Sequence, residues 1–559
     1  MGMTVVGARL DGETVGVRCV DGVIEAIGVD VAAAPGDETL EAGGAQLVAP
    51  LLNGHTHAAM TLFRGSGGDL PLMPWLQERI WPVEAKLSDE DVYWGARLAC
   101  AEMVRSGTTR FWDMYWQPAA TARAVGDGSL LGRAALGFAG QWSILGRVDA
   151  SRLALLEEAR ERLSGEDSAL RARLLARLAL ELYYSGDPER RLALSEQAVA
   201  LARRLGDART LAVCLDARHY ALWRPENVHE RLDVAAELRG VAQETGDPEL
   251  ELEGAGWTVV DLLELGDVQG ADVQIAAASK LAEALQRPIW LWWTSLLRCT
   301  RAQLAGRFEE AERLAEETLE IGRRGQAENA VNAYAQAMFN IRREQGRLAE
   351  VEPAVRRFIE LYPMLVAWRA GLALLLVELD RHDEARAEFA RVRAEELPRD
   401  ANWLIAVTLL AEVCGALGDG SRAESLYALL EPYAGRNVVV GRAATCNGAA
   451  SRLLGVLAAA MRAWELAEGH FISALAMHER MGARPWVART QVAYAEMLLA
   501  RRRRGDKARA GELLKDAVTI AETLGMPVVA ARARSAGAGS VPLVRPAESA
   551  RSARGLSPS

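Results

Sequence analysis

The first fifty residues alternate apolar and polar side chains over short stretches, and Asp-Gly pairs separate these stretches. Apolar side chains at every second position predict β-strands with one buried face, and Asp-Gly is a preferred two-residue hairpin turn. We therefore expect strands at residues 4–8, 15–20 and 23–27. Together they predict a small β layer at the start of the chain.

An apolar run at residues 46–52 leads into the sequence Asn-Gly-His-Thr-His, which predicts a buried strand that ends in a polar tip. Acidic residues at 88–91 indicate the start of a helix that ends at Gly107, and residues 108–116 are strand-like again. The order strand, helix, strand predicts one βαβ unit of a parallel barrel or a doubly wound sheet.

From about Gly126 onward the strand pattern disappears, and helical segments rich in Ala, Leu, Glu and Arg alternate with Gly-Asp or Gly-Arg turns. Two helices for each period of about 40 residues predict a solenoid of helical hairpins. Small residues are expected where two helices cross closely. One small or apolar residue follows each turn, 34 to 44 residues from the next, at Ala271, Ala311, Val351, Ala385, Ala423, Ala467 and Ala510.

The pattern thus predicts a mainly α protein with three parts. Residues 1–124 form a small α+β segment, with a β layer and a partial βαβ unit. Residues 125–534 form the helical repeat array. Residues 535–559 are rich in Ser, Ala, Gly and Pro without periodicity, and we expect them to be a disordered tail.

Charge and composition exclude several classes of protein. A net charge of -10 disfavours nucleic-acid binding, and the basic run at residues 501–504 is expected to be a solvated turn. The six cysteines stand singly, so neither a zinc ribbon nor a disulfide framework is predicted, and a reducing cytoplasm is the expected compartment. No signal peptide or membrane-spanning run of about 18 apolar residues is predicted.

His55 and His57 form the one motif with evident chemistry. Residues i and i+2 of a strand point to the same face, so both imidazoles could reach one metal ion at the carboxyl end of the strand. The spacing predicts a candidate metal site.

The sequence around this pair resembles the first barrel strand of the amidohydrolase superfamily, over residues 47–65. The motifs LMPWL at 72–76, WPVE at 81–84 and SGTT at 106–109 are similar to deaminases of S-adenosylhomocysteine and methylthioadenosine and to their chlorohydrolase relatives. The resemblance implies a divalent metal, commonly zinc, that activates water for attack on an aromatic C–N or C–Cl carbon. It implies His55 and His57 as metal ligands and Glu84 as a substrate contact.

The rest of the chain departs from that family, whose barrel supplies a third His ligand, a His-x-x-Glu motif, a further His and an Asp after later strands. Gly270-Ala271-Asp272 is the nearest match to the Asp motif, but it lies at a predicted helix-pair turn. A catalytic zinc normally has three protein ligands, so we expect an incomplete metal site. Five histidines lie in predicted helices without Glu three positions later: His219, His229, His382, His470 and His478.

The helical part, from about Gly126 to Leu524, resembles the tetratricopeptide-like C-terminal region of large bacterial signalling ATPases, including LuxR-type and cyclase-linked regulators. Three segments carry the resemblance, at residues 178–187, 306–315 and 433–437. No Gly-x-x-x-x-Gly-Lys-Ser/Thr phosphate loop and no DNA-reading helix-turn-helix is present in the sequence. The resemblance implies a sensor or partner-binding arm without its ATPase.

Three hypotheses follow. The first is a helical-repeat interaction or regulatory scaffold with a truncated, inactive amidohydrolase-like N-terminus, whose array binds a protein, a peptide or a small effector. At least one of Trp290, Trp292 and Trp293 is then expected to line a groove or to be exposed, while core packing is the main expectation for each. The second is a zinc-dependent amidohydrolase that acts on non-peptide C–N bonds and completes its metal site through dimerisation or a partner chain. The third is a fusion product with a vestigial N-terminus. The sequence leaves the oligomeric state open.

Overall fold

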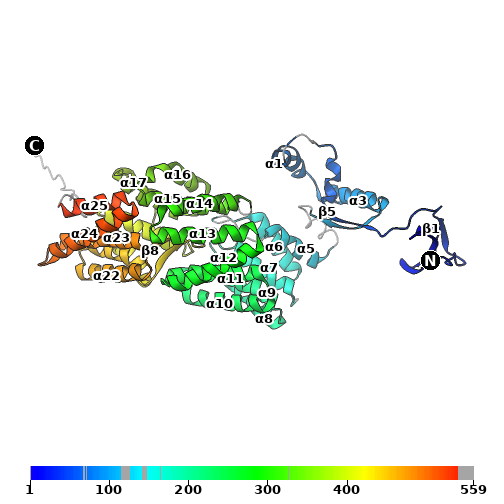
Figure 1. Cartoon of the computed structure of the whole chain (residues 1–559), viewed down its shortest axis with the longest axis horizontal. Coiled ribbons are helices and arrows are strands. Elements are labelled where there is room, and N and C mark those ends of the chain that lie inside the picture. Colours follow the sequence, from blue (N-terminus) through cyan, green and yellow to red (C-terminus); the bar gives the residue numbers. More distant parts are fainter. Residues whose placement is uncertain are drawn as a thin grey trace, which may run out of the picture. The chain divides into compact units, whose positions relative to one another are not determined.

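The computed structural model describes residues 2–66, 70, 72–114, 126–140, 146, 148–163, 165, 167–324 and 327–538. The fold is mainly helical, with a small β sheet at the N-terminus (Figure 1). Its contacts divide the chain into two units, Met1–Ala134 and Ala135–Ser559. The boundary that the sequence predicts at residues 124 and 125 lies outside the described residues.

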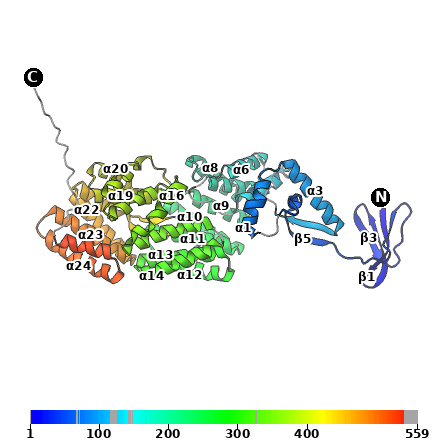
Figure 2. The same ribbon diagram turned by 90° about the horizontal axis from the view of Figure 1, so that it is seen from above.

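The first four strands form one sheet in the order β3-β2-β1-β4, which Figure 2 shows in dark blue. β2 is antiparallel to β1 and β3, and β4 is parallel to β1. Asp11 and Asp21 have φ of 49° and 51°, and the glycine after each is also positive, which suits the left-handed hairpin turns expected of Asp-Gly. The predicted β layer is confirmed. Its strands are β1 (Gly2–Leu10), β2 (Glu13–Val20), β3 (Val23–Gly28) and β4 (Glu38–Glu41).

A second element of the first unit is the parallel pair β5 (Leu51–Thr56) and β6 (Thr108–Asp113), joined through helix α3 (Asp89–Arg105). The side chain of Ser88 accepts a hydrogen bond from the backbone N–H of Asp91, and the Asp91 carboxylate accepts one from the N–H of Ser88. This capping box starts the helix where the acidic residues predicted it. Short helical segments precede it: η1 (Ala58–Phe63), α1 (Leu72–Trp75), η2 (Leu76–Ile80) and α2 (Trp81–Glu84).

The prediction of a buried strand at residues 46–52 is wrong. The strand starts only at Leu51, and the side chains of Leu51 and Leu52 are 60% and 70% exposed. In the described part of the chain β5 pairs with β6 alone, so no third strand extends this pair toward a barrel. Apolar residues that a closed barrel would bury therefore remain exposed, including Trp112 of β6 at 72%.

The second unit is built from consecutive helices, and α5 (Gly128–Ala139) spans its start. No helix among the described residues combines the length and apolarity that a bilayer crossing demands. The helices up to residue 344 are α6 (Ala150–Arg162), α7 (Ala169–Glu181), α8 (Pro188–Leu205), α9 (Ala208–Ala221), η3 (Pro225–Asn227), α10 (Val228–Thr245), α11 (Pro248–Leu265), α12 (Val268–Leu285), α13 (Pro288–Ala305), α14 (Phe308–Arg323) and α15 (Ala327–Glu344).

The later elements continue the same alternation of helix and short turn, and α25 is the last. It extends to Gly537, so residues 535–537 are helical, which corrects the predicted start of the tail; residues 539–559 lie outside the described residues. These elements are η4 (Leu348–Val351), α16 (Glu352–Leu361), α17 (Ala367–Glu378), α18 (His382–Ala390), η5 (Ala394–Glu396), α19 (Trp403–Leu417), α20 (Gly420–Leu430), η6 (Glu431–Tyr433), β7 (Asn437–Val440), β8 (Thr445–Ala449), α21 (Ala450–Ala460), α22 (Trp464–Arg480), α23 (Arg484–Arg501), α24 (Asp506–Leu524) and α25 (Pro527–Gly537).

Gly-Asp turns join several of these helices, for a simple reason. Gly246 ends α10 with φ of 63°, a left-handed conformation that glycine adopts without strain. The next residue, Asp247, caps α11 by accepting hydrogen bonds from the N–H groups of Glu249 and Leu250, at 3.2 and 3.3 Å. One dipeptide thus ends one helix and begins the next.

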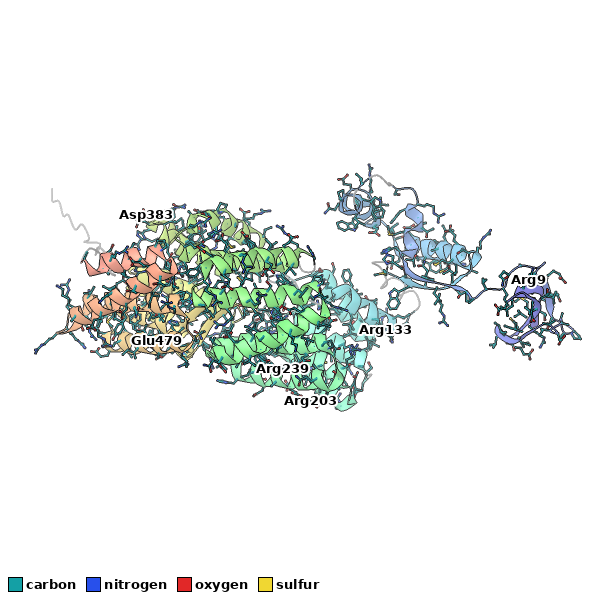
Figure 3. The ribbon with its side chains drawn as sticks, viewed as in Figure 1. Arg9, Arg133, Arg203, Arg239, Asp383 and Glu479 are labelled. Atoms are coloured by element: carbon teal, nitrogen blue, oxygen red, sulfur yellow. The ribbon has the colours of Figure 1, made fainter. Side chains whose placement is uncertain are left out.

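Most helices from α6 onward pack against the next one, and α12 to α15 lie side by side in Figure 1. Several odd-numbered helices also contact the next odd-numbered one, as α7 does α9 and α9 does α11. Even-numbered helices carry an exposed charged face, on which Figure 3 labels Arg203 of α8 and Arg239 of α10. The alanines expected at close crossings are fully buried, whereas Val351 is only partly buried: Ala271, Ala311, Ala385, Ala423, Ala467 and Ala510.

Ion pairs link the odd-numbered helices of the C-terminal half. Arg343 of α15 donates to Glu378 of α17 and Glu412 of α19, at 2.6 and 2.7 Å. Arg452 of α21 donates to Glu412 at 3.0 Å. Arg489 of α23 and Glu344 of α15 also pair, at 2.9 Å. These charges are largely buried, so each needs its partner.

The expectation of helices alone after residue 125 is wrong at one place. β7 and β8 form an antiparallel hairpin, which is placed between α20 and α21 in the chain. The hairpin contacts α11, α13, α15, α19, α21 and α22. Its strands hold four and five residues, too few to stand out beside long helices in the sequence pattern.

Hydrogen bonds from helix side chains hold the hairpin backbone. The hydroxyl of Thr300 lies 2.6 and 2.9 Å from the carbonyl oxygens of Ala443 and Ala444. The N–H of Ala449 donates to Nε2 of His478 at 2.7 Å, and the indole of Trp486 donates to the carbonyl of Cys446 at 3.2 Å. The hairpin is therefore fixed from α13, α22 and α23 together.

We expect Thr300→Val to lower the free energy of unfolding of the helical unit by about 1–3 kcal/mol, because two buried carbonyls lose their side-chain donor. Urea unfolding followed by far-ultraviolet circular dichroism measures the change. Thr258→Val is a matched control, because among the described residues the Thr258 hydroxyl bonds only to the carbonyl of Gly254 in its own helix. Equal effects of the two substitutions would contradict the role of Thr300.

A second prediction concerns pH. Burial, followed by the charge of Arg452, lowers the pKa of His478 to about 3. The unfolded chain takes up a proton near pH 6.5 and the folded chain does not, so stability falls as pH falls from about 6.5 toward 3. His478→Gln removes this loss. We expect the variant to have a lower free energy of unfolding than the wild type at pH 7.5. The gap between the two free energies should narrow by about 2 kcal/mol at pH 5.

His229→Gln is the control for this experiment, since His229 is exposed. Its gap to the wild type should stay constant across the same pH range. A constant gap for His478→Gln as well would show that His478 is not held neutral by the fold.

Candidate functional site

The candidate metal pair lies at the carboxyl end of β5. His55 is exposed and His57 is partly buried, and their ring centroids lie 5.1 Å apart with the rings edge to face. Nδ1 of His57 is buried without a hydrogen-bond partner. The structure therefore brings the two predicted ligands together and leaves one ring nitrogen unsatisfied.

The residues around the pair do not complete a zinc site. In the described part of the chain, no group of three His, Cys, Asp or Glu side chains could hold a metal ion. Asp113 lies at the end of the neighbouring strand, where its carboxylate accepts a hydrogen bond from the N–H of Ala58 at 3.2 Å. Two imidazoles alone bind zinc weakly, so the donor set does not match a resident zinc ion.

Glu84, the predicted substrate contact, is the last residue of α2. Its Oε1 atom is buried and accepts no hydrogen bond from the described residues. No hydrogen bond in this part of the chain joins Glu84 to either histidine of the pair.

A different site lies inside the helical unit, where odd-numbered helices face the β7–β8 hairpin. The cavity has a volume of about 80 Å³. We call it the hairpin cavity. Aromatic, acidic and amide side chains line it, from α9, α11, α13 and α15 and from the hairpin: Asp216, Tyr220, Trp223, Glu253, Trp257, Trp292, Asn329, Asn332, Gln336 and Arg442.

Two carboxylates of the hairpin cavity have different partners. The indole N–H of Trp257 donates to Oδ1 of Asp216 at 2.7 Å. Arg442 of the hairpin turn donates to Oε2 of Glu253 at 2.5 Å, so these two charges compensate each other. Asp216 forms no ion pair with any described residue, and it is only half-buried.

Trp257 holds this arrangement in place. One face of its ring stacks on His219, with centroids 4.3 Å apart, and the guanidinium of Arg442 lies 4.2 Å from its centroid. Nε2 of His219 lies 2.7 Å from Oδ2 of Asp261, and both side chains are fully buried. The indole is therefore immobilised by a buried pair on α9 and α11, and its N–H is aimed at Asp216.

Burial, and next the charge of Glu253, raise the pKa of Asp216 to about 7. The indole hydrogen bond and the charges of Arg442 and Arg177 act in the opposite direction. Asp216 is thus a carboxyl group with less positive charge around it than a stable carboxylate needs.

The sequence pattern did not predict the residues of the hairpin cavity, apart from Trp292. That side chain was expected either to pack in the core or to line a groove. Trp290, Trp292 and Trp293 are all buried, and Trp292 lines the cavity. A signal was present, because Asp216, Glu253 and Trp292 recur at about the repeat period and so occupy equivalent helix positions. The hairpin that closes the cavity gave no such signal.

Comparison with known proteins bears on most of the first unit and on the start of the second, through α8. Residues 47–206 match the model of the amidohydrolase family. A 5-methylthioadenosine/S-adenosylhomocysteine deaminase of Syntrophobacter fumaroxidans is 55% identical over 103 residues, which are 18% of this chain and 24% of that protein. A 5'-deoxyadenosine deaminase of Methanosarcina mazei is 48% identical over 123 residues, 22% of this chain and 28% of that protein. The chain thus spans about a quarter of the length of these curated relatives.

Among solved structures, a circular tandem repeat protein with novel repeat topology and enhanced subunit contact surfaces aligns with 76% of this chain and 93% of its own. The identity is 17% and the TM-score is 0.14. The family match extends from residue 47 to residue 206, so it includes the first helices of the second unit. The matched residues are similar to the amidohydrolase family and to adenosine-type deaminases.

Proposed function

We propose that the protein is a binding and regulatory module, in which a tetratricopeptide-like α-solenoid recognises a ligand and the amidohydrolase-like segment performs no hydrolysis. The observation that carries this proposal is the hairpin cavity, lined by successive odd-numbered helices. A cavity with polar groups inside a repeat array costs stability unless those groups find partners. A bound ligand supplies such partners.

The N-terminal segment supports the part of the proposal that concerns hydrolysis. His55 and His57 remain together, but the described residues offer them no third metal ligand. Leu51, Leu52 and Trp112 on the β5–β6 pair are exposed, so the described residues do not cover this pair with the layers of a full barrel. Metal-assisted hydrolysis needs a fixed metal with an open position for water, which two imidazoles do not provide.

The proposal includes a protein or peptide partner on the helical array. Arrays of stacked helix pairs expose long surfaces on which a protein or peptide can bind. The even-numbered helices of this array carry charged side chains that such a partner could contact. The resemblance of the array to the C-terminal region of large signalling ATPases supports a sensor or partner-binding role.

An alternative function is a zinc-dependent amidohydrolase that acts on non-peptide C–N bonds, as the names of its relatives describe. The identity of 55% over the matched stretch favours it. A second copy of the chain or another protein would then have to supply the missing metal ligands and barrel strands.

Metal content separates the two functions. We expect the full chain, purified without chelators, to hold far less than one zinc ion per chain, and we expect His55→Ala to leave that value unchanged. We also expect no change in ultraviolet absorbance when concentrated protein is mixed with 5-methylthioadenosine or S-adenosylhomocysteine.

About one zinc per chain, lost in His55→Ala but kept in His229→Ala, would contradict the proposal. Deamination that disappears in the same variant would establish the alternative. His229 suits the control because it is exposed and lies on α10, outside the N-terminal unit.

The location of a partner can be read from cross-links, because the chain contains only four lysines: Lys86, Lys280, Lys507 and Lys515. Three of them lie on the helical array, on α12 and α24. We expect an amine-reactive reagent to join a co-purifying protein to these three in the full chain. Cross-links at Lys86 alone would place the partner on the N-terminal unit and contradict the proposal.

A further inference from the structure

We propose that the hairpin cavity binds a small organic ammonium ion, with the carboxylate of Asp216 as its counter-charge. This inference rests on the proposed function of the array as a binding module and names the chemical class of its ligand. The charges, the aromatic walls and the unpaired polar atoms of the cavity each support it.

The charge balance of the cavity calls for a cation. Glu253 and Arg442 neutralise each other through a contact of 2.5 Å. Asp216 receives one neutral hydrogen bond, from the indole of Trp257, and its Oδ2 atom accepts none from the described residues. One negative charge is left without an opposite charge, and a ligand ammonium group would supply it.

The walls of the cavity suit the carbon-bound hydrogens of such an ion. The rings of Tyr220, Trp223 and Trp257 form a cluster with centroids between 5.1 and 5.8 Å apart and with edge-to-face geometry. Aromatic faces attract organic cations, and the attraction strengthens when water is excluded. Arg442 already occupies such a position over Trp257, at 4.2 Å, which shows that a cation is stable there.

An independent observation points to a bound molecule. Asn332 of α15 is only 3% exposed and lines the cavity. Its Oδ1 atom accepts a hydrogen bond from Gln336 at 3.1 Å, but its amide nitrogen donates to none of the described residues. This nitrogen is therefore available to donate to an acceptor on the ligand.

The volume limits the size of the ligand. A cavity of about 80 Å³ holds on the order of five water molecules, or one small organic molecule. We therefore infer a primary amine with a compact body rather than a peptide or a nucleotide.

The ionisation of Asp216 supports the same conclusion. Four groups face it: Glu253 on α11, Arg442 on the hairpin, Arg177 on α7 and the indole of Trp257. Their balance raises the pKa of Asp216 to about 7, because burial and Glu253 outweigh the two arginines. A bound cation would restore the carboxylate, so amine binding should strengthen as pH rises from 6 to 8.

The test uses benzylamine and its uncharged isostere benzyl alcohol, with isothermal titration calorimetry on the full chain. We expect benzylamine to bind at least tenfold more tightly than benzyl alcohol at pH 8. Asp216→Asn should weaken benzylamine binding about tenfold or more, because a charge-assisted hydrogen bond is lost. Asp233→Asn removes the same charge from an exposed position on α10 and should leave binding unchanged.

Thermal unfolding shows whether Asp216→Asn is folded and tests the charge independently. Between about pH 4 and 7 the folded chain holds a proton on Asp216 that the unfolded chain has released, so ionisation of Asp216 lowers stability as pH rises. Asp216→Asn should therefore raise the midpoint of unfolding more at pH 8 than at pH 5. A variant that lowers the midpoint at pH 8 would contradict an uncompensated charge.

Equal binding of benzylamine and benzyl alcohol, equal affinity in Asp216→Asn, or no binding of either probe would overturn the inference. These outcomes are distinct from failure of the proposed function. A zinc-loaded, deaminating chain would refute the proposed function even if benzylamine bound, whereas a metal-free chain that cross-links a partner but ignores both probes would refute this inference alone.

Discussion

The helical unit depends on one constraint: the backbone of the β7–β8 hairpin is buried among helices and must find hydrogen-bond partners there. Thr300 supplies one from α13, and His478 and Trp486 supply others from the consecutive helices α22 and α23, which lie far from α13 in the sequence. Water cannot replace these partners in the interior, so each side chain is required where it lies. The neutral state of His478 follows from the same requirement, because its Nε2 atom must accept rather than donate.

The charged side chains of the odd-numbered helices are paired differently in the two halves of the helical unit. In the C-terminal half, Arg343 and Glu412 belong to a network in which every charge has an opposite neighbour, and this network joins helices without leaving a charge in excess. Around the hairpin cavity, Glu253 and Arg442 are paired but Asp216 is not. Buried charges of the odd-numbered helices are thus neutralised by ion pairs in the C-terminal half, whereas Asp216 in the other half forms none with the described residues.

The regular parts of the fold could be predicted from sequence because each depends on local physics. Asp11-Gly12 favours a tight turn wherever it stands, Gly246-Asp247 ends one helix and begins the next, and Ala311 is small where helices cross. The buried strand expected at residues 46–52 was wrong, because burial depends on what covers a strand and not on its own composition. The β7–β8 hairpin was missed because its stability comes from distant helices.

The candidate sites divide in the same way. His55 and His57 could be recognised as a pair, since two residues of one strand determine their separation. Whether they hold a metal depends on side chains elsewhere in the fold, which no local pattern reveals. The hairpin cavity lay beyond prediction for a similar reason: Asp216 and Trp257 come from different helices, and Arg442 reaches them from a turn that the helical pattern concealed.

The hairpin also changes how the array must respond to stress. In an ordinary repeat protein each unit touches only its neighbours, so terminal repeats can fray while the others persist. Here residues 437–449 connect α11 and α13 to α22, across nearly half of the chain. Separation of the C-terminal helices from the array would expose the hairpin. It would also expose the faces of α11 and α13 that the hairpin covers. The array should therefore melt as a cooperative body rather than from its ends, and its folding should wait for contacts of long sequence separation.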